Sequence, residues 1–109
     1  MQTIDRESLR LKMRSADDLT VVEVLPKKSY DKFHIPGAIN VPVGSDDFAE
    51  RIQAAANKDD EVVVYCQNTE CDASPRAAEK MEKLGFTKVF DYEAGKDDWR
   101  DAGLPVEPH

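Results

Sequence analysis

The sequence has little that would attach the protein to a nucleic acid or to a membrane. Its 15 lysines and arginines are outnumbered by 22 aspartates and glutamates, which gives a formal net charge of −7, whereas nonspecific nucleic-acid binding needs clustered cations. No apolar run approaches the roughly 20 residues that a helix needs to cross a bilayer. The first residues, Met1 to Asp5, lack the basic and apolar parts of a signal peptide. We therefore expect a cytoplasmic protein that binds neither nucleic acid nor membrane.

Residues that commonly bind metals are also few. The two cysteines, Cys66 and Cys71, have no partner set of cysteines or histidines at a spacing typical of zinc sites. Both histidines, His34 and His109, lie elsewhere in the sequence. We therefore expect no metal and no cofactor, so that any chemistry comes from the side chains and backbone of the chain itself.

What the sequence does contain is enough apolar residues for one hydrophobic core. A length of 109 residues, with 40% hydrophobic and 34% charged residues, is typical of a single globular domain. No internal repeat or linker divides the chain. We therefore expect one domain over residues 1–109.

Strand and helix patterns alternate along the chain. Short strands are predicted over 21–25, 37–41, 62–65 and 89–90. Helices are predicted from Asp5 onward and over 29–33, 45–56, 74–84 and 97–102. The residues expected on the inward faces of three of these helices are Leu9, Met13 and Ala16, then Phe48, Ile52 and Ala55, then Ala77, Met81 and Leu84. This alternation indicates an α/β fold with a parallel sheet and helices on both faces.

Cys66 lies where such a fold most often binds ligands. It follows the most apolar strand, Val62 to Tyr65, and precedes a helix-start signal, Ser74-Pro75. The unpaired N–H groups and the positive dipole end of a helix N-terminus stabilise an anion, and a thiolate is an anion. Two interpretations fit this position: a cysteine nucleophile, or a small buried side chain at the end of a strand.

Four segments, in the same order, resemble the hallmarks of the single-domain rhodaneses. They are Val22-Glu23-Val24 with Tyr30 and His34 to Asn40; Val62 to Cys66; Arg76 to Phe86; and Ala94-Gly95, Asp98-Trp99 and Ala102 to Val106. The resemblance covers roughly residues 3–107. It implies a three-layer rhodanese-like fold, in which a central, mostly parallel sheet of about five strands has helices on both faces.

The same resemblance implies sulfur transfer by a ping-pong mechanism. Cys66 would take a sulfane sulfur from a small-molecule or protein donor, such as thiosulfate or a persulfide. It would become a persulfide and pass the sulfur to a thiol or cyanide acceptor. Backbone N–H groups of the active-site loop would hold the anionic sulfur. The loop comprises Gln67, Asn68, Thr69, Glu70, Cys71, Asp72, Ala73 and Ser74.

The loop departs from the family's usual pattern in length and in charge. It looks about two residues longer, and it contains no arginine, lysine or glycine. Glu70 and Asp72 would repel a dianion, so we expect weak activity on thiosulfate and a persulfide as the better donor. Arg76 is the nearest cation in the sequence and a possible contact for an oxyanion. Glu23 and Leu25 also differ, because the family usually has Asp and Arg there.

Cys71 allows two main interpretations. It is either a small side chain that fills space in the loop or a resolving thiol. A resolving thiol would attack a Cys66 persulfide, release sulfide and leave a Cys66–Cys71 disulfide. A separation of five residues lets two Cα atoms come within the roughly 4.4–6.8 Å that a disulfide needs. The strand-end position of Cys66 disfavours a third interpretation, in which Cys71 is the main nucleophile.

Two other functions stay open. A rhodanese-like domain can be a non-catalytic binding or regulatory module, and a loop without arginine or glycine is typical of one. Phosphatase or arsenate-reductase chemistry needs an arginine that binds the oxyanion in a bidentate manner. Arg76 provides this only if the helix begins after Ser74.

Three ring side chains near these hallmarks are predicted to have structural roles. His34 is expected to hydrogen-bond to backbone beside the Pro36-Gly37 turn. Trp99 is expected to fasten the C-terminal helix onto the core. Tyr65 is expected to lie in the core with a partner for its hydroxyl.

Overall fold

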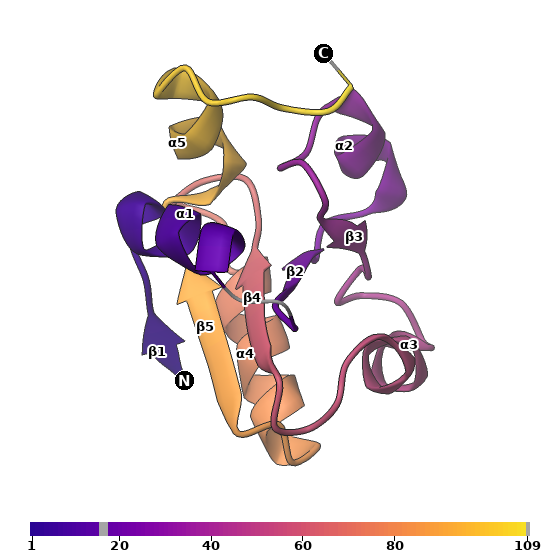
Figure 1. Ribbon diagram of the computed structural model, residues 1–109. Coiled ribbons are helices and arrows are strands. Elements are labelled where there is room, and N and C mark those ends of the chain that lie inside the picture. Colours follow the sequence, from indigo (N-terminus) through magenta and orange to yellow (C-terminus); the bar gives the residue numbers. More distant parts are fainter. Residues whose placement is uncertain (16–17, 109) are drawn as a thin grey trace.

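The computed structural model describes residues 1–15 and 18–108, and its centre is a five-stranded sheet (Figure 1). The strands of this part of the chain are β1 (Gln2–Thr3), β2 (Thr20–Glu23), β3 (Ile39–Asn40), β4 (Glu61–Tyr65) and β5 (Lys88–Tyr92), in the spatial order β1-β5-β4-β2-β3. The helices are α1 (Arg6–Ser15), α2 (Lys27–Lys32), α3 (Phe48–Ala55), α4 (Ala73–Lys83) and α5 (Gly95–Asp101). All neighbouring strands are parallel, which confirms the predicted α/β fold. None of the helices in the described residues is long and apolar enough to cross a membrane.

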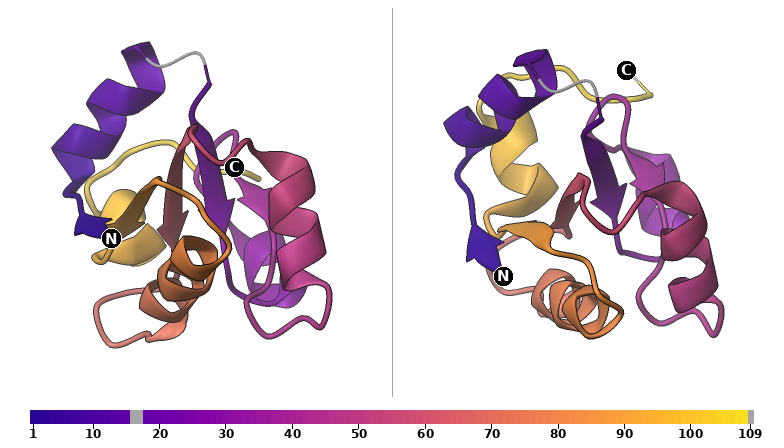
Figure 2. Two further views of the ribbon diagram at one scale, coloured as in Figure 1. Left: turned by 90° about the horizontal axis from the view of Figure 1, so that it is seen from below. Right: turned by 60° about the horizontal axis from the view of Figure 1, so that its bottom comes forward.

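The two faces of the sheet are covered by different helices, because side chains alternate along each strand. On β4, Val62 and Val64 belong to a core cluster with residues of α3 and α4. Val63 and Tyr65 belong to a second cluster with residues of α1 and α5. Figure 2 shows these helix pairs on opposite sides of the sheet. All four side chains are fully buried, as expected for a central parallel strand.

The helices α3 and α4 are present as predicted, but their boundaries differ. α4 begins at Ala73, so Pro75 is its third residue instead of its first. The missing N–H of Pro75 costs no helical hydrogen bond there, because the first turn has no acceptor for it. α3 begins at Phe48, since residues 43–47 form turns. Its predicted inward residue Ala55 is exposed, and Ala56 is buried instead.

Other differences concern the two ends of the chain and the end of α4. β1 is not predicted by the sequence, because two exposed polar residues carry no alternating pattern; it pairs with β5 at the sheet edge. α5 begins at Gly95, two residues before its predicted start. Leu84 follows α4 and is partly buried against the core cluster. The predicted helix position Ala16 lies outside the described residues.

The three ring side chains predicted to be structural do hold segments together. Trp99 is buried, and its Nε1–H donates to the carbonyl of Pro105 at 2.7 Å. His34 Nδ1 lies 2.9 Å from the carbonyl oxygen of Tyr30, and the two rings stack with centroids 3.7 Å apart. Tyr65 is fully buried, and its hydroxyl donates to a buried carboxylate at 3.0 Å. These contacts confirm the structural interpretation of all three.

The start of α5 is fastened to the end of β4 and to the loop that follows it. The Lys96 N–H donates to the carbonyl of Cys66, and the Asp97 N–H donates to the carbonyl of Gln67, both at 3.0 Å. The Gln67 side-chain amide donates in turn to the Asp97 carboxylate at 2.6 Å. These bonds give partners to N–H groups that the first turn of a helix leaves unpaired. They also determine the path of the chain on both sides of the Cys66 carbonyl.

A buried ion pair extends from the same contact. Lys96 Nζ lies 3.0 Å from Glu23 Oε2, and both side chains are fully buried. Lys96 also donates to the carbonyl oxygens of Ser29 and Phe33, each at 2.7 Å, while Glu23 accepts from the Tyr65 hydroxyl. Burial raises the pKa of Glu23, and the hydrogen bonds from Lys96 and Tyr65 oppose that rise. Glu23, which departs from the family's usual pattern, thus has a cation from α5 as its partner.

Removing the cation of this pair should destabilise the protein strongly. We predict that Lys96→Met lowers the free energy of unfolding by about 3–5 kcal/mol, because it leaves the buried carboxylate of Glu23 uncompensated. The double variant Glu23→Gln/Lys96→Met should be less destabilised than Lys96→Met alone. Urea unfolding of the three proteins measures this. A Lys96→Met variant as stable as wild type would contradict the buried ion pair.

Gly95 allows α5 to approach the loop closely. Its φ is +74°, and a Cβ added there would lie 2.6 Å from the carbonyl carbon and oxygen of Gln67. We predict that Gly95→Ala costs about 1–3 kcal/mol of backbone strain, with a further loss because the loop is displaced. Gly103→Ala is the matched control, since Gly103 has φ +80° but open space around it. Equal losses for the two variants in urea unfolding would contradict direct packing of α5 on the loop.

Candidate active site

The two cysteines meet at the carboxyl end of β4. Cys66 is the first residue after the strand and is 1% exposed. Its Sγ is bonded to the Sγ of Cys71 in a disulfide, with the two Cα atoms 6.4 Å apart. The same Sγ lies 3.5 Å from Ser74 Oγ, in the first turn of α4. The helix that the sequence predicts after Cys66 therefore begins in contact with the cysteine sulfur.

Of the two cysteines, Cys71 is the one that lines a cavity. Cys71 is half-buried and lines a cavity of about 150 Å³, whereas Cys66 lies beneath the loop. The residues that line this cavity are Thr69, Cys71, Ser74, Pro75, Asp91 and Glu93. Cys71 therefore borders this cavity, and Cys66 is not among the residues that line it.

Asn68 organises the loop. Its carbonyl accepts from the Cys71 N–H at 3.1 Å, and its Oδ1 accepts from the Glu70 N–H at 3.0 Å. Its side-chain amide lies 3.3 Å from Asp97 Oδ2 and donates to it. Two of the backbone N–H groups that the resemblance assigns to an anionic sulfur are therefore bonded within the loop.

The charged residues of the loop lie at the surface. Glu70 and Asp72 are exposed, as is Thr69, and Ala73 is half-buried. Arg76 Nη1 lies 3.7 Å from Asp72 Oδ1, and 57% of the Arg76 side chain is exposed. The structure thus brings Cys66, Cys71 and Ser74 together, and it places Arg76 beside Asp72, outside the lining of the cavity.

The wall of the cavity contains a carboxylate that the sequence does not single out. Asp91 is fully buried, and neither of its oxygens has a hydrogen-bond partner in the described part of the chain. It lies on the α4 side of the sheet, because it is two residues after Val89 on β5 and side chains two residues apart point to the same face; Val89 packs in the cluster of α3 and α4. Burial raises the pKa of Asp91; the nearby Ser74 hydroxyl opposes this, and the charge of Glu93 adds to it. An acidic residue inside an apolar strand is the one sequence signal that points to it.

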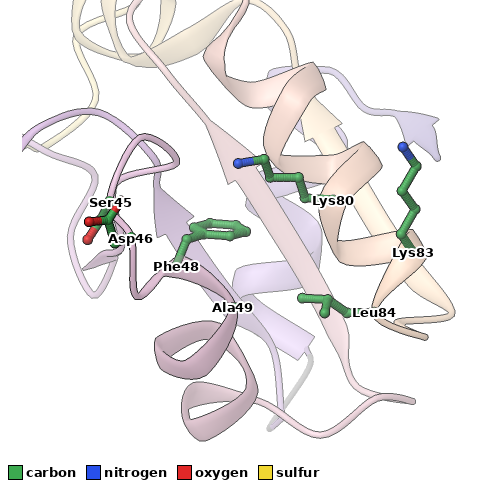
Figure 3. A pocket seen from close by; sticks show the side chains of 7 residues that line it. All are labelled: Ser45, Asp46, Phe48, Ala49, Lys80, Lys83 and Leu84. Carbon is green, nitrogen blue, oxygen red and sulfur yellow. The ribbon is translucent and has the colours of Figure 1, made fainter.

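A second hollow lies between α3 and α4 (Figure 3). It measures about 260 Å³ and is lined by Ser45, Asp46, Phe48, Ala49, Lys80, Lys83 and Leu84. Lys80 Nζ lies 5.9 Å from the centre of the Phe48 ring, and Lys83 extends away from that ring. Neither cysteine lines this hollow. Over residues 1–15 and 18–108, no group of three or more His, Cys, Asp or Glu is arranged to hold a metal ion.

The sequence is similar to known rhodanese-like proteins over most of its length. A family model described as a rhodanese-like domain matches residues 6–102. The HTH-type transcriptional regulator Rv0324 of Mycobacterium tuberculosis is 37% identical over 97 residues, which cover 89% of this chain and 41% of the regulator. YrkF of Bacillus subtilis, provisionally named a sulfur carrier protein, is 32% identical over 96 residues, which cover 88% of this chain and 49% of YrkF. The chain spans less than half the length of either relative.

A solved structure agrees with this similarity. The crystal structure of the BH2092 protein from Bacillus halodurans matches with a TM-score of 0.81 and 27% identity, over 97% of this chain and 76% of that chain. The family model also covers strands β2 to β5 and the whole loop that carries both cysteines. The chain therefore belongs to the rhodanese-like domain family.

Proposed function

We propose that this domain is a sulfurtransferase that carries a sulfane sulfur on Cys66 and releases it with Cys71 as resolving thiol. The observation that carries the proposal is the meeting of the two sulfurs at the end of β4, with Cα atoms 6.4 Å apart. Natural disulfides span roughly 4.4–6.8 Å between Cα atoms. Membership of the family, and a relative that is named as a sulfur carrier, support sulfur chemistry at this site.

The first half-reaction loads Cys66. Its thiolate attacks the outer sulfur of a persulfide donor, R–S–SH. The S–S bond of the donor breaks, RS⁻ leaves, and the product is Cys66–S–SH, so that atoms and charge balance. Ser74 Oγ lies 3.5 Å from Cys66 Sγ, close to where its hydroxyl can donate to the thiolate. The positive end of α4 acts in the same direction.

The second half-reaction unloads Cys66. The sulfur passes to a thiol or cyanide acceptor, or Cys71 resolves the persulfide by attacking Cys66 Sγ. In the second case hydrosulfide leaves, and the Cys66–Cys71 disulfide forms. A dithiol reductant then restores both thiols. We place the protein in the cytoplasm, where such reductants keep thiols reduced.

The charges around the loop favour a donor other than thiosulfate. Glu70 and Asp72 are exposed beside the cysteines, and Asp91 and Glu93 line the cavity. Arg76 is paired with Asp72 at the surface. A dianion is repelled there more strongly than a neutral or singly charged persulfide. A low-molecular-weight or protein persulfide is therefore the donor that we propose.

A non-catalytic binding module is the alternative function, and the burial of Cys66 favours it. Cys66 as a whole residue is 1% exposed, so its thiol reacts with a donor only when the loop opens. Phosphatase or arsenate-reductase chemistry has less support, because Arg76 faces Asp72 and not the cavity. A catalytic and a non-catalytic domain differ in whether reduced Cys66 accepts a sulfur.

Replacing Cys71 by serine should stop the release of sulfide without stopping the loading of Cys66. Reduced wild-type protein, mixed with equimolar glutathione persulfide and no added thiol, should release about one hydrosulfide per chain as the disulfide forms. Cys71→Ser should release it at least about tenfold more slowly and retain most of the persulfide until glutathione is added in excess over the one equivalent that loading releases. Quantifying sulfide over time measures both rates.

The variant Cys66→Ser provides the control for this experiment, because it cannot be loaded and should release no sulfide above the donor's own decay. Equal release from wild type and Cys71→Ser would show that Cys71 is not the resolving thiol. Release from Cys66→Ser at the wild-type rate would contradict the role of Cys66.

A further inference from the structure

Asp91 is a buried titratable group that the steps above do not use. It is fully buried, both of its oxygens lack a hydrogen-bond partner in the described residues, and it lines the cavity that Cys71 faces. Burying a carboxylate without partners costs stability, and an apolar side chain would pack at this point of β5 at no such cost. A role in the chemistry of the neighbouring cysteines accounts for a carboxylate at this position.

Asp91 shares a cavity with Cys71, and Ser74 links the lining of that cavity to Cys66. Cys71 and Ser74 line the same cavity of about 150 Å³ as Asp91. Ser74 Oγ lies 3.5 Å from the Sγ of Cys66, which is bonded to Cys71. A serine hydroxyl both donates and accepts hydrogen bonds. Asp91 therefore borders the same space as Cys71, and the Ser74 hydroxyl lies between the lining of that space and Cys66 Sγ.

The groups around Asp91 leave its charge without a counterion. The residues that line its cavity are Thr69, Cys71, Ser74 and Pro75 from the loop and α4, and Glu93 directly after its own strand. Its register partners are Val64 on β4 and Thr3 on β1. Burial raises the pKa of Asp91, the Ser74 hydroxyl opposes that rise, and the charge of Glu93 adds to it. A carboxylate whose pKa is raised is a stronger base than an ordinary one, and so a better acceptor for the proton of a thiol.

We propose that Asp91 accepts the proton of Cys71 when Cys71 resolves the Cys66 persulfide, a role that rests on the proposed function. The Cys71 thiol gives its proton to the Asp91 carboxylate, and its sulfur bonds to Cys66 Sγ. The bond from Cys66 Sγ to the outer sulfur breaks, HS⁻ leaves, and Asp91 is left as the carboxylic acid. The sulfur of Cys71 is oxidised to the disulfide level while the outgoing sulfur is reduced to hydrosulfide, so no outside oxidant is needed. When a dithiol reduces the disulfide, Asp91 returns the proton to Cys71.

The variant Asp91→Asn tests this role, because asparagine keeps the shape of the side chain but does not titrate. The reduced full chain is loaded with equimolar glutathione persulfide, and single-turnover sulfide release is followed between about pH 5 and pH 9. Sulfide release by the wild-type protein should already be fast at pH 7. Asp91→Asn should be at least about tenfold slower there, and its rate should rise only as an ordinary thiol ionises, near pH 8.5.

The matched control is Asp98→Asn, which makes the same chemical change outside the cavity. Asp98 accepts hydrogen bonds from Arg6 and Tyr92, and its loss should leave the pH profile of sulfide release as in wild type. The urea unfolding midpoint serves as the folding control. Asp91→Asn should be at least as stable as wild type, because it removes an unpaired buried carboxylate.

A second measurement needs no sulfur donor and so separates this inference from the proposed function. Dithiothreitol reduces the Cys66–Cys71 disulfide in two exchange steps, and Cys71 leaves in the first step if the dithiol attacks Cys66, or in the second if it attacks Cys71. At pH 7 the release of Cys71 should be at least about tenfold slower in Asp91→Asn than in Asp98→Asn, because the departing Cys71 sulfur receives no proton. If wild-type Cys66 takes up no sulfur, the proposed function fails and the reduction rate alone decides the role of Asp91. Wild-type rates and pH profiles in Asp91→Asn overturn the inference, even where its unfolding midpoint changes.

Discussion

The contact between the start of α5 and the end of β4 is the constraint on which the site depends. Backbone hydrogen bonds join Lys96 to the carbonyl of Cys66 and Asp97 to the carbonyl of Gln67. The Lys96 side chain then continues to Glu23, at the end of β2, which is the neighbour of β4 in the sheet. One buried lysine thus joins the carboxyl ends of two central strands to a helix from the other end of the chain. Because the Cys66 carbonyl is part of this contact, the position of the Cys66 sulfur depends on it.

The loop after β4 gives the two cysteines different surroundings. Cys66 is buried against the start of α4, whereas Cys71 lines a small cavity together with Asp91. In the proposed function, this difference corresponds to two roles: the buried Cys66 carries the transferred sulfur, and the more accessible Cys71 releases it. A disulfide between them also protects Cys66 from reaction until a dithiol opens it. In the proposed function, the acidic surroundings select against strongly anionic donors.

The fold was predictable where a local pattern determines the structure. The run from Val62 to Tyr65 is long and apolar enough to indicate a central strand, and Cys66 directly after it indicates a ligand-binding edge. The resemblance to rhodaneses rested on segments that hold the core, such as Trp99 and the helix after the loop. The family model and the solved structure confirm it.

Residues whose role depends on distant partners were not predictable in the same way. Lys96 is followed by charged residues, a pattern that is typical of an exposed first turn of a helix. Only the packing of α5 on the sheet buries it against Glu23. Asp91 is marked in the sequence only by its place in an apolar strand, and it is the order of the strands that brings it to the cavity beside Cys71. The start of α5 likewise depends on carbonyls that lie about 30 residues earlier in the chain. The roles of the loop residues stay predictions, because they concern a reaction and not a fold.

The most direct test of sulfur transfer is mass spectrometry of the reduced protein after incubation with glutathione persulfide or, separately, with thiosulfate. Trapping with iodoacetamide before digestion shows which cysteine carries added sulfur. Transfer through Cys66 predicts one additional sulfur on the Cys66 peptide with glutathione persulfide and little with thiosulfate. No added sulfur on Cys66 from either donor, together with slow alkylation of the reduced thiol, would contradict the transfer and favour a non-catalytic binding domain.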